Sequence, residues 1–291
     1  MQKKKRKCKG PTQKERVQEL LDILEDGVLN FLPDPEKFKA ILEMKALMPN
    51  YSLRNIIIAK GQLPHARFLA GYKRWNELGR YVRKGEEAIR ILAPRIKKVK
   101  NEETGEEENK KIGYIPVAVF DYSQTEGEPL PIDKIKIELE GDSPEARAII
   151  SIAEQIAEQD DCPIYYGDTG TANGFYRPFF HDITVSDKLS VNHRCKTLVH
   201  ELVHSKVDRF GSIERSSKEK EVVAEGSAFI VCSYFGLDTS DYSFEYVKGW
   251  GNEDNPVMRY AERIFETSSS IIKEFEDLMV AKTEADEECV A

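Results

Sequence analysis

Residues 197–206, TLVHELVHSK, constrain the fold of this chain more than any other stretch, because they place His200, Glu201 and His204 in the spacing H-E-x-x-H. Side chains four residues apart lie on the same face of an α-helix, so the two imidazoles can bind one metal ion. Apolar residues give this helix a flank that can be buried: Leu198, Val199, Leu202, Val203 and Val207. The motif therefore predicts a packed helix whose histidines face a cleft.

Zinc is the ion that this spacing usually serves, and we expect one per chain. A bound metal ion lowers the pKa of its water to about 7 and polarises a carbonyl group. Glu201 would take the proton of the water and pass it to the leaving amine, so it is the candidate catalytic base of a metallopeptidase. The alternative is a helix with two packed histidines, because the motif also occurs by chance.

A catalytic zinc needs a third protein ligand and an open position. In EVVAE, Glu221 and Glu225 are again four residues apart on a predicted helix. We expect Glu221 to be the third ligand and Glu225 to accept a hydrogen bond from a ligand histidine, which would fix the tautomer of that histidine. A solvated helix face is the alternative for this pair, and the rival ligands are His181, His193 and Asp208.

The stretch HDITVS, residues 181–186, is a predicted strand that precedes the motif. By analogy with metallopeptidases that carry this motif, we expect it to be an edge strand that holds an extended peptide substrate by backbone pairing.

The charge of the chain is unevenly distributed. Residues 1–100 contain 24 of the 43 basic and 11 of the 51 acidic residues, whereas the remainder contains 19 basic and 40 acidic residues. Opposite signs in two blocks predict two modules with different partners, and the basic block is the candidate for a polyanion. The basic N-terminus MQKKKRKCKG fits a phosphate-binding arm, a nuclear-import signal or a solubilising tail.

Aromatic and basic residues alternate between residues 51 and 98, as in proteins that stack bases on aromatic rings while cations follow the phosphates. This composition predicts a binding site for single-stranded DNA. Its candidate residues are Arg54, Lys60, Arg67, Tyr72, Lys73, Arg74, Trp75, Arg83 and Lys84. The alternative is that Phe68, Tyr72 and Trp75, at helical spacing, belong to the core and the cations to a solvated face.

Periodicity predicts an α+β protein of two domains. Helices are expected at 12–29, 34–48 with Asp34 as N-cap, and 52–61, followed by a long β-hairpin within 85–122. Residues 1–127 would form the basic domain, 128–143 a linker, and 144–291 the metallopeptidase domain. Further helices are expected at 143–159, around the motif, at 217–235 and at 255–279.

The five cysteines contain no C-x-x-C pair, which argues against a zinc knuckle or a disulfide framework. No apolar run approaches the length of a membrane span. We expect a cytoplasmic protein with no membrane partner.

Several segments in order resemble the ArdC-type antirestriction proteins of plasmids and conjugative elements. They include YSLRNIIIAKGQLPHARFLAGYKRWNELGRYVRKGE, VFDYSQTE, HDITVS, HELVH and EVVAE, and the resemblance spans about residues 12–275. It implies a single-stranded-DNA-binding domain joined to a zincin-like metallopeptidase domain, with His200, His204 and Glu221 as metal ligands and Glu201 as catalytic base. The chain reads Ser205-Lys206-Val207 where members of the family often carry Thr-Gly.

The leading hypothesis is therefore a DNA-associated zinc metallopeptidase that protects transferred single-stranded DNA and acts on an unidentified protein or peptide. One alternative is a protein that shields DNA and uses its metal only for stability. Another is a regulatory protease that cleaves a DNA-bound repressor or a crosslinked protein.

Overall fold

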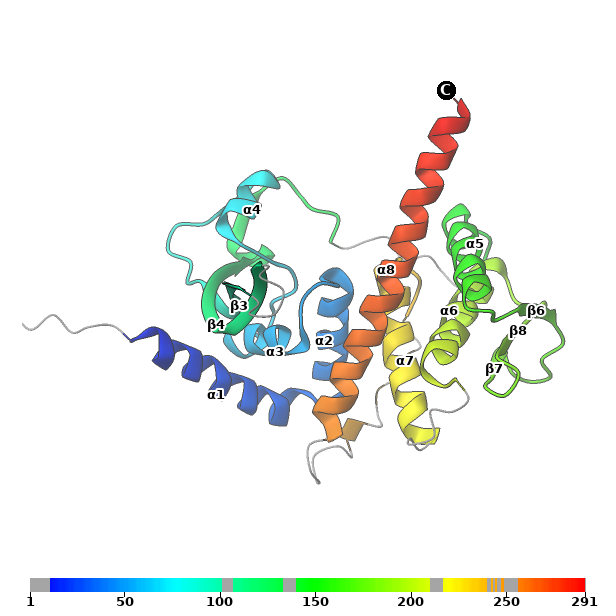
Figure 1. Ribbon diagram of the computed structural model, residues 1–291, viewed down its shortest axis with the longest axis horizontal. Coiled ribbons are helices and arrows are strands. Elements are labelled where there is room, and N and C mark those ends of the chain that lie inside the picture. Colours follow the sequence, from blue (N-terminus) through cyan, green and yellow to red (C-terminus); the bar gives the residue numbers. More distant parts are fainter. Residues whose placement is uncertain are drawn as a thin grey trace, which may run out of the picture. The chain divides into compact units, whose positions relative to one another are not determined.

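A computed structural model describes residues 11–100, 107–132, 140–209, 217–239, 242, 244, 247–248 and 256–290 of the chain. The chain forms two compact units (Figure 1). The first contains the residues up to Asn30 together with Arg54–Pro129, and the second contains Phe31–Leu53 together with Leu130–Ala291. Helices and strands occur in both units, so the predicted α+β class is confirmed.

The core of the first unit joins two predicted helices to the hairpin. Leu20 of α1 (Gln13–Phe31), Ile58 of α3 (Leu53–Gln62) and Leu92 of β3 (Ile89–Lys100) form one buried cluster. A glycine is required where the two helices meet, because a Cβ atom at Gly61 would lie 2.5 Å from Cγ2 of Ile23. Burial of these apolar side chains, at about 25 cal/mol per Å², holds the helices to the sheet.

The predicted hairpin is confirmed. β3 pairs antiparallel with β4 (Glu107–Asp121), and the short β1 (Leu69–Ala70) adds a third strand at the end of β4. Helix α4 (Tyr72–Glu77) and a two-stranded sheet of β2 (Arg80–Val82) and β5 (Thr125–Gly127) complete the unit.

Asp121 fixes the turn that follows β4. Its buried carboxylate accepts backbone N–H groups of Arg67 at 2.7 Å and Phe68 at 3.0 Å, and it caps the 3₁₀ turn η1 (Tyr122–Gln124) through Ser123. The VFDYSQ sequence therefore has a structural role, because it satisfies buried backbone donors of two loops.

The second unit is dominated by helices. α2 and α5 begin as predicted, with Asp34 and Ser143 as N-caps and proline at the first helical position. α7 packs against α2, α6 and α8, and α5 packs against α6 and α8. The bounds are α2 Pro35–Leu47, α5 Pro144–Gln159, α6 Val191–Val207, α7 Ser217–Tyr234 and α8 Pro256–Val290.

A three-stranded sheet lies beside α6, in the order β6-β8-β7. β8 (Asp182–Ser186) pairs parallel with β6 (Ile164–Gly167) and antiparallel with β7 (Gly174–Arg177). The prediction of an edge strand at residues 181–186 is therefore wrong: β8 is central because a strand at 174–177, which the sequence analysis did not propose, covers its other side.

The two units divide the chain differently from the predicted domains, because the second unit begins at Leu130 within the predicted linker and also includes an earlier segment. Residues Phe31–Leu53, assigned to the basic domain with the rest of 1–127, cluster with the second unit. Phe38 on α2 is fully buried and contacts Phe244 edge-to-face at 5.5 Å between ring centroids. Among the described helices, none is both long and apolar enough to cross a membrane.

Candidate metal centre

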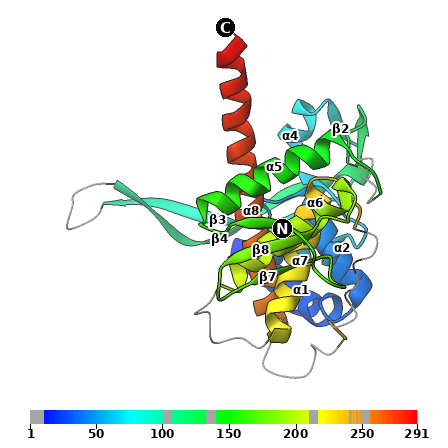
Figure 2. The ribbon, with the colours of Figure 1, turned by 90° about the vertical axis from the view of Figure 1, so that its right-hand side faces the viewer.

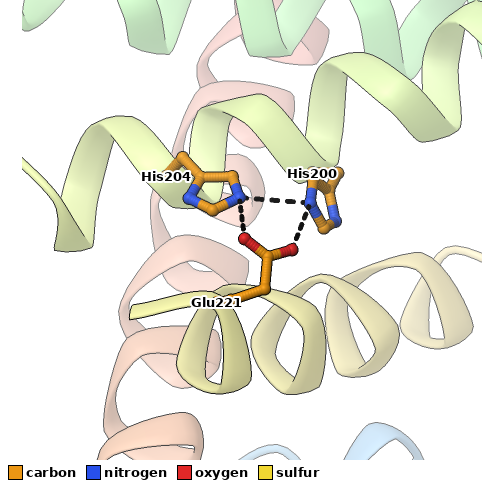
Figure 3. Close-up of side chains that lie close together, drawn as sticks. All are labelled: His200, His204 and Glu221. Carbon is orange, nitrogen blue, oxygen red and sulfur yellow. Dashed lines mark hydrogen bonds and ion pairs between the residues drawn. The ribbon is translucent and has the colours of Figure 1, made fainter. Parts of the chain in front are cut away.

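The structure brings His200, His204 and Glu221 together (Figure 3). The two imidazole Nε2 atoms are 3.2 Å apart, and the carboxylate oxygens of Glu221 lie 3.8 Å from Nε2 of His200 and 3.6 Å from Nε2 of His204. The histidines come from two successive turns of α6, and Glu221 comes from the facing helix α7. The predicted ligands are therefore neighbours in space.

The spacing of these atoms fits a single small metal ion. Ligand atoms about 2.0–2.1 Å from a tetrahedral ion would lie about 3.3 Å from one another. The three separations in the structure, 3.2, 3.6 and 3.8 Å, are close to this value. Two imidazoles and one carboxylate are also the donor set of many catalytic zinc sites.

Helix α6 lines the cleft with the face that carries His200, and its opposite face is buried. Ser190 caps its start by accepting the backbone N–H of His193, and the opposite flank is packed away from solvent. The apolar residues predicted to form this flank are buried: Leu198, Val199, Leu202, Val203 and Val207. The helix ends at Val207, with Asp208 as C-cap.

Asp208 orients His204. Its Oδ2 atom lies 2.6 Å from Nδ1 of His204, which leaves Nε2 directed toward His200 and Glu221. The role of orienting a ligand histidine was predicted for Glu225, and Asp208 was considered only as a rival ligand; the structure shows this contact for Asp208 and His204. Glu225 lies along the cleft instead.

The titratable groups of the site respond to burial and to one another. Burial, then the nearby charges of His204 and Lys196, lowers the pKa of His200 to about 4, which keeps its imidazole neutral at pH 7. Burial also raises the pKa of Glu201 to about 7 and that of Glu225 to about 7, and the charge of Glu221 adds to both shifts. The cleft therefore concentrates carboxylates that a cation would stabilise.

The cleft in front of the site has a volume of about 300 Å³. Lys196 enters it one helical turn before His200, with its ammonium 4.6 Å from the ring centroid of Tyr242. Polar side chains predominate in its lining: Asn173, Gly174, His193, Lys196, Thr197, His200, Glu201, Glu221, Glu225 and Tyr242.

Strand β7 passes directly over the start of the motif. A Cβ atom at Gly174 would lie 2.8 Å from Cγ2 of Thr197 and 3.3 Å from Cγ of Glu201. The backbone N–H of Tyr176 donates a hydrogen bond to Glu201 and opposes the effect of burial on its pKa. The edge position of the described sheet, which was predicted for β8, is therefore occupied by β7.

The rival histidines have other partners. His181 contacts the hydroxyl of Tyr176 through Nδ1 at 2.8 Å and the carbonyl oxygen of Asp160 through Nε2 at 3.1 Å. His193 lies on α6 and contacts the side chain of Asn173 at 3.4 Å. Neither belongs to the cluster of His200, His204 and Glu221.

The predicted DNA-binding residues do not share one environment. The side chain of Trp75 is fully buried, its indole N–H donates to the carbonyl oxygen of Phe120 at 3.0 Å, and it contacts Phe68 edge-to-face. Lys60 is also buried and donates to the carbonyl oxygen of Ala66 at 3.1 Å. These two predictions are corrected, because helical spacing placed both side chains in the core.

The other candidates lie nearer the surface, and several are paired with carboxylates. Glu77 forms ion pairs with Lys73 at 3.9 Å and Arg74 at 3.2 Å, and Glu86 pairs with the half-buried Arg83 at 2.7 Å. The remaining exposed candidates are Arg54, Arg67, Tyr72 and Lys84.

Sequence reasoning missed Asp208 as an orienting carboxylate, Lys196 and Gly174. Spacing carried a signal for two of them, because Asp208 is four residues after His204 and Lys196 is four residues before His200. Gly174 lies 26 residues before the motif, and no local pattern connects it to Glu201.

Comparison with known proteins identifies related chains. Residues 11–120 match the family model described as the N-terminal domain of anti-restriction factor ArdC. The chain is 26% identical, over 89% of its length, to the uncharacterised protein pXO2-81 of Bacillus anthracis, and it spans about half the length of that relative.

Two crystal structures of the antirestriction protein ArdC from plasmid R388 have a similar fold. The metal-free structure matches 88% of this chain and 98% of ArdC with a TM-score of 0.55 at 17% identity. The Mn(II)-bound structure matches 87% of this chain and 98% of ArdC with a TM-score of 0.52 at 18% identity.

Proposed function

We propose that this chain is an antirestriction protein of the ArdC type, because residues 11–120 match the model of the ArdC N-terminal domain and the fold of ArdC matches 88% of the chain. In this proposal its first unit binds single-stranded DNA and its second unit is a zincin-like metallopeptidase. Both parts would act to protect DNA during transfer between cells.

The convergence of His200, His204 and Glu221 is the observation that carries the peptidase proposal. Three ligands with near-tetrahedral spacing, beside a cleft, fit a divalent ion with one open position. The Mn(II)-bound ArdC structure supports a divalent metal in this fold, and the ligand set favours zinc. His200, His204 and Glu221 would hold the ion.

When bound, the ion would supply Lewis-acid polarisation of a carbonyl group and acidify a water molecule. Glu201 extends from the same helix and is buried, and its raised pKa of about 7 suits it to accept a proton and pass it on near neutral pH. The backbone N–H of Tyr176 favours the charged form of its carboxylate, and Asp208 orients the ring of His204. β7 offers backbone groups for an extended peptide to pair with.

Two other functions remain alternatives. The metal could serve only the stability of a DNA-shielding protein, or the peptidase could act on a DNA-bound repressor or a crosslinked protein. The position of Glu201 in the lining of the cleft favours a catalytic site over a structural one, because a closed structural site needs no proton acceptor beside its ligands.

Glu201→Gln in the full chain tests the peptidase. Zinc content should stay near one per chain, and hydrolysis of casein or of a degenerate peptide library should fall at least 100-fold. Glu221→Gln is the matched variant, which should lose metal as well. Equal activity in wild type and Glu201→Gln would reject the peptidase, and unchanged protection of transferred DNA by Glu201→Gln would favour shielding.

A further inference from the structure

Residues 94–98 of β3 and 110–114 of β4 form a paired segment that we define as the arm. Figure 2 shows the two strands running together as a ribbon. The third strand, β1, pairs only with Phe120 and Asp121, so it does not reach the arm. All ten residues are exposed except Gly113, which is intermediate.

The arm is basic on both of its faces. Its described residues include five cations and no carboxylate: Arg95, Lys97, Lys98, Lys110 and Lys111. Lys97 is paired directly across the ladder with Lys110. Like charges in opposite positions destabilise a strand pair, and an isolated two-stranded hairpin is only marginally stable in water. A bound polyanion would remove this repulsion.

One face of the arm combines cations with exposed apolar groups. Tyr114 pairs across the ladder with Pro94, and Ile96 pairs with Lys111, so these residues share a face. Tyr114 is 43% exposed and Ile96 is 59% exposed. The ammonium of Lys111 lies 4.1 Å from the ring centroid of Tyr114.

We propose that the arm is a binding surface for single-stranded nucleic acid. Phosphates would neutralise the lysines on both strands, and an unstacked base would cover the ring of Tyr114 and the side chain of Ile96. A duplex would satisfy the cations alone, because its bases are stacked and the apolar face of the arm would stay in water. The proposal rests on the proposed DNA-binding function and assigns it to residues other than the nine candidates named from the sequence.

The ion pairs of the first unit favour the arm over the region around α4. There, Lys73 and Arg74 share Glu77, and Arg83 is bound to Glu86, so phosphate binding would have to break these pairs. Within residues 94–98 and 110–114 every charged side chain is basic, and the nearest carboxylates of the same strands, Glu107 and Glu108, precede this segment of β4.

Glutamates beyond the arm limit where the nucleic acid can lie. Residues 102–108 contain five glutamates, which repel phosphate. The nucleic acid should therefore cross the arm at residues 94–98 and 110–114 and avoid residues 102–108. Replacing Glu102 and Glu103 by glutamine should strengthen binding two-fold or more, and weaker or unchanged binding would contradict this path.

The experiment measures the affinity of the full-length chain for a fluorescent 30-nucleotide oligo(dT) and for a matched duplex, at several salt concentrations. The arm variant is Lys97→Gln/Lys98→Gln/Lys110→Gln/Lys111→Gln. A control removes the same charge elsewhere: Lys14→Gln/Lys37→Gln/Lys188→Gln/Lys273→Gln. We expect oligo(dT) affinity to fall at least ten-fold in the arm variant and less than three-fold in the control. The slope of log affinity against log salt concentration, which we call the salt slope, should also become shallower by about 0.7 per lost phosphate contact.

Tyr114→Ala separates stacking from charge. It should weaken oligo(dT) binding several-fold at every salt concentration and leave both the salt slope and duplex binding unchanged. Photo-crosslinking of oligo(dT) to the wild type, followed by peptide mapping, gives a measurement that does not depend on variants folding; crosslinks should fall within 94–98 and 110–114.

Three results have distinct meanings. If the wild type binds and the arm variant behaves as the control does, the arm is not the surface, although DNA binding stands. If the wild type binds the duplex as tightly as oligo(dT), and Tyr114→Ala lowers both affinities equally, single-strand recognition by the arm is rejected. If the wild type binds no nucleic acid, the proposed DNA-binding function itself fails, and the arm proposal fails with it.

Discussion

The Nδ1 atom of His204 lies 2.6 Å from the Oδ2 atom of Asp208, one helical turn further along the same segment. Burial alone lowers the pKa of His204, but the bond to Asp208 and the charges of Glu201 and Glu221 together raise it. The bond fixes which nitrogen faces the cleft, because a ring whose Nδ1–H is donated to a carboxylate presents Nε2 as the electron pair donor. The C-cap of α6 thus takes part in building the site.

Asp208→Asn should lower zinc affinity about 10–100-fold, the usual effect of removing a carboxylate that orients a ligand histidine. Competition titration with a zinc chelator measures it. Asp168→Asn, on an exposed loop carboxylate, is the control and should leave affinity unchanged. Equal zinc affinity in wild type and Asp208→Asn would mean that the helix alone orients His204.

Gly174→Ala should destabilise the chain by about 1–3 kcal/mol, because the added methyl group overpacks the contact between β7 and α6. It would lie 2.8 Å from Thr197 Cγ2 and 3.0 Å from the Thr184 carbonyl oxygen, so neighbouring atoms must shift. Peptidase activity should fall by more than the loss of folded protein explains, because the added methyl group would also lie 3.3 Å from Cγ of Glu201.

Gly167→Ala is the matched control for Gly174→Ala. Gly167 ends β6 of the same sheet, and a Cβ atom there has no neighbour within 4 Å. Its midpoint of urea unfolding should equal or exceed that of the wild type. If both glycine variants unfold at the same urea concentration, the close approach of β7 to α6 is not a constraint.

Trp75→Ala should destabilise the first unit by about 3–5 kcal/mol, as expected for removing a buried aromatic side chain. Any loss of DNA binding would then accompany unfolding. Tyr72→Ala, three residues earlier and 58% exposed, should change the unfolding free energy by less than about 1 kcal/mol. Chemical denaturation followed by circular dichroism measures both, and a folded Trp75→Ala that loses only DNA binding would show a direct role for this ring.

The stability of the second unit should depend on pH through Lys45. This buried lysine donates hydrogen bonds to Pro49 O, Tyr51 O and Ser269 Oγ, and burial lowers its pKa from 10.5 to about 8. Between pH 8 and 10.5 the unfolded chain therefore binds more protons than the folded chain, so this group favours folding increasingly as pH rises.

The free energy of unfolding of the wild type, relative to Lys45→Met, should rise by up to about 3 kcal/mol across this window. Urea unfolding at pH 7.5, 8.5, 9.5 and 10 measures the difference. The exposed Lys188→Met should show no such trend. A constant difference between wild type and Lys45→Met would mean that the hydrogen bonds keep the ammonium charged in the folded chain.

The local patterns of the chain predicted its helices, its long hairpin and its candidate ligands. Asp34 and Ser143 cap helices where proline follows them, and His200 and His204 share a face because of the 3.6-residue period. Glu221 was predicted from a second i, i+4 pair and lies beside them. These features depend on neighbours in sequence, and the sequence therefore contains the information that determines them.

Only the tertiary structure decided which residues surround the site and which of the aromatic and basic residues are buried. Gly174 meets Glu201 because a strand far along the chain packs on α6, and β8 became a central strand for the same reason. Trp75 is buried although its neighbours Lys73 and Arg74 are exposed. Composition records how many aromatic and charged residues a segment has, whereas burial depends on packing between distant segments, which local sequence does not encode.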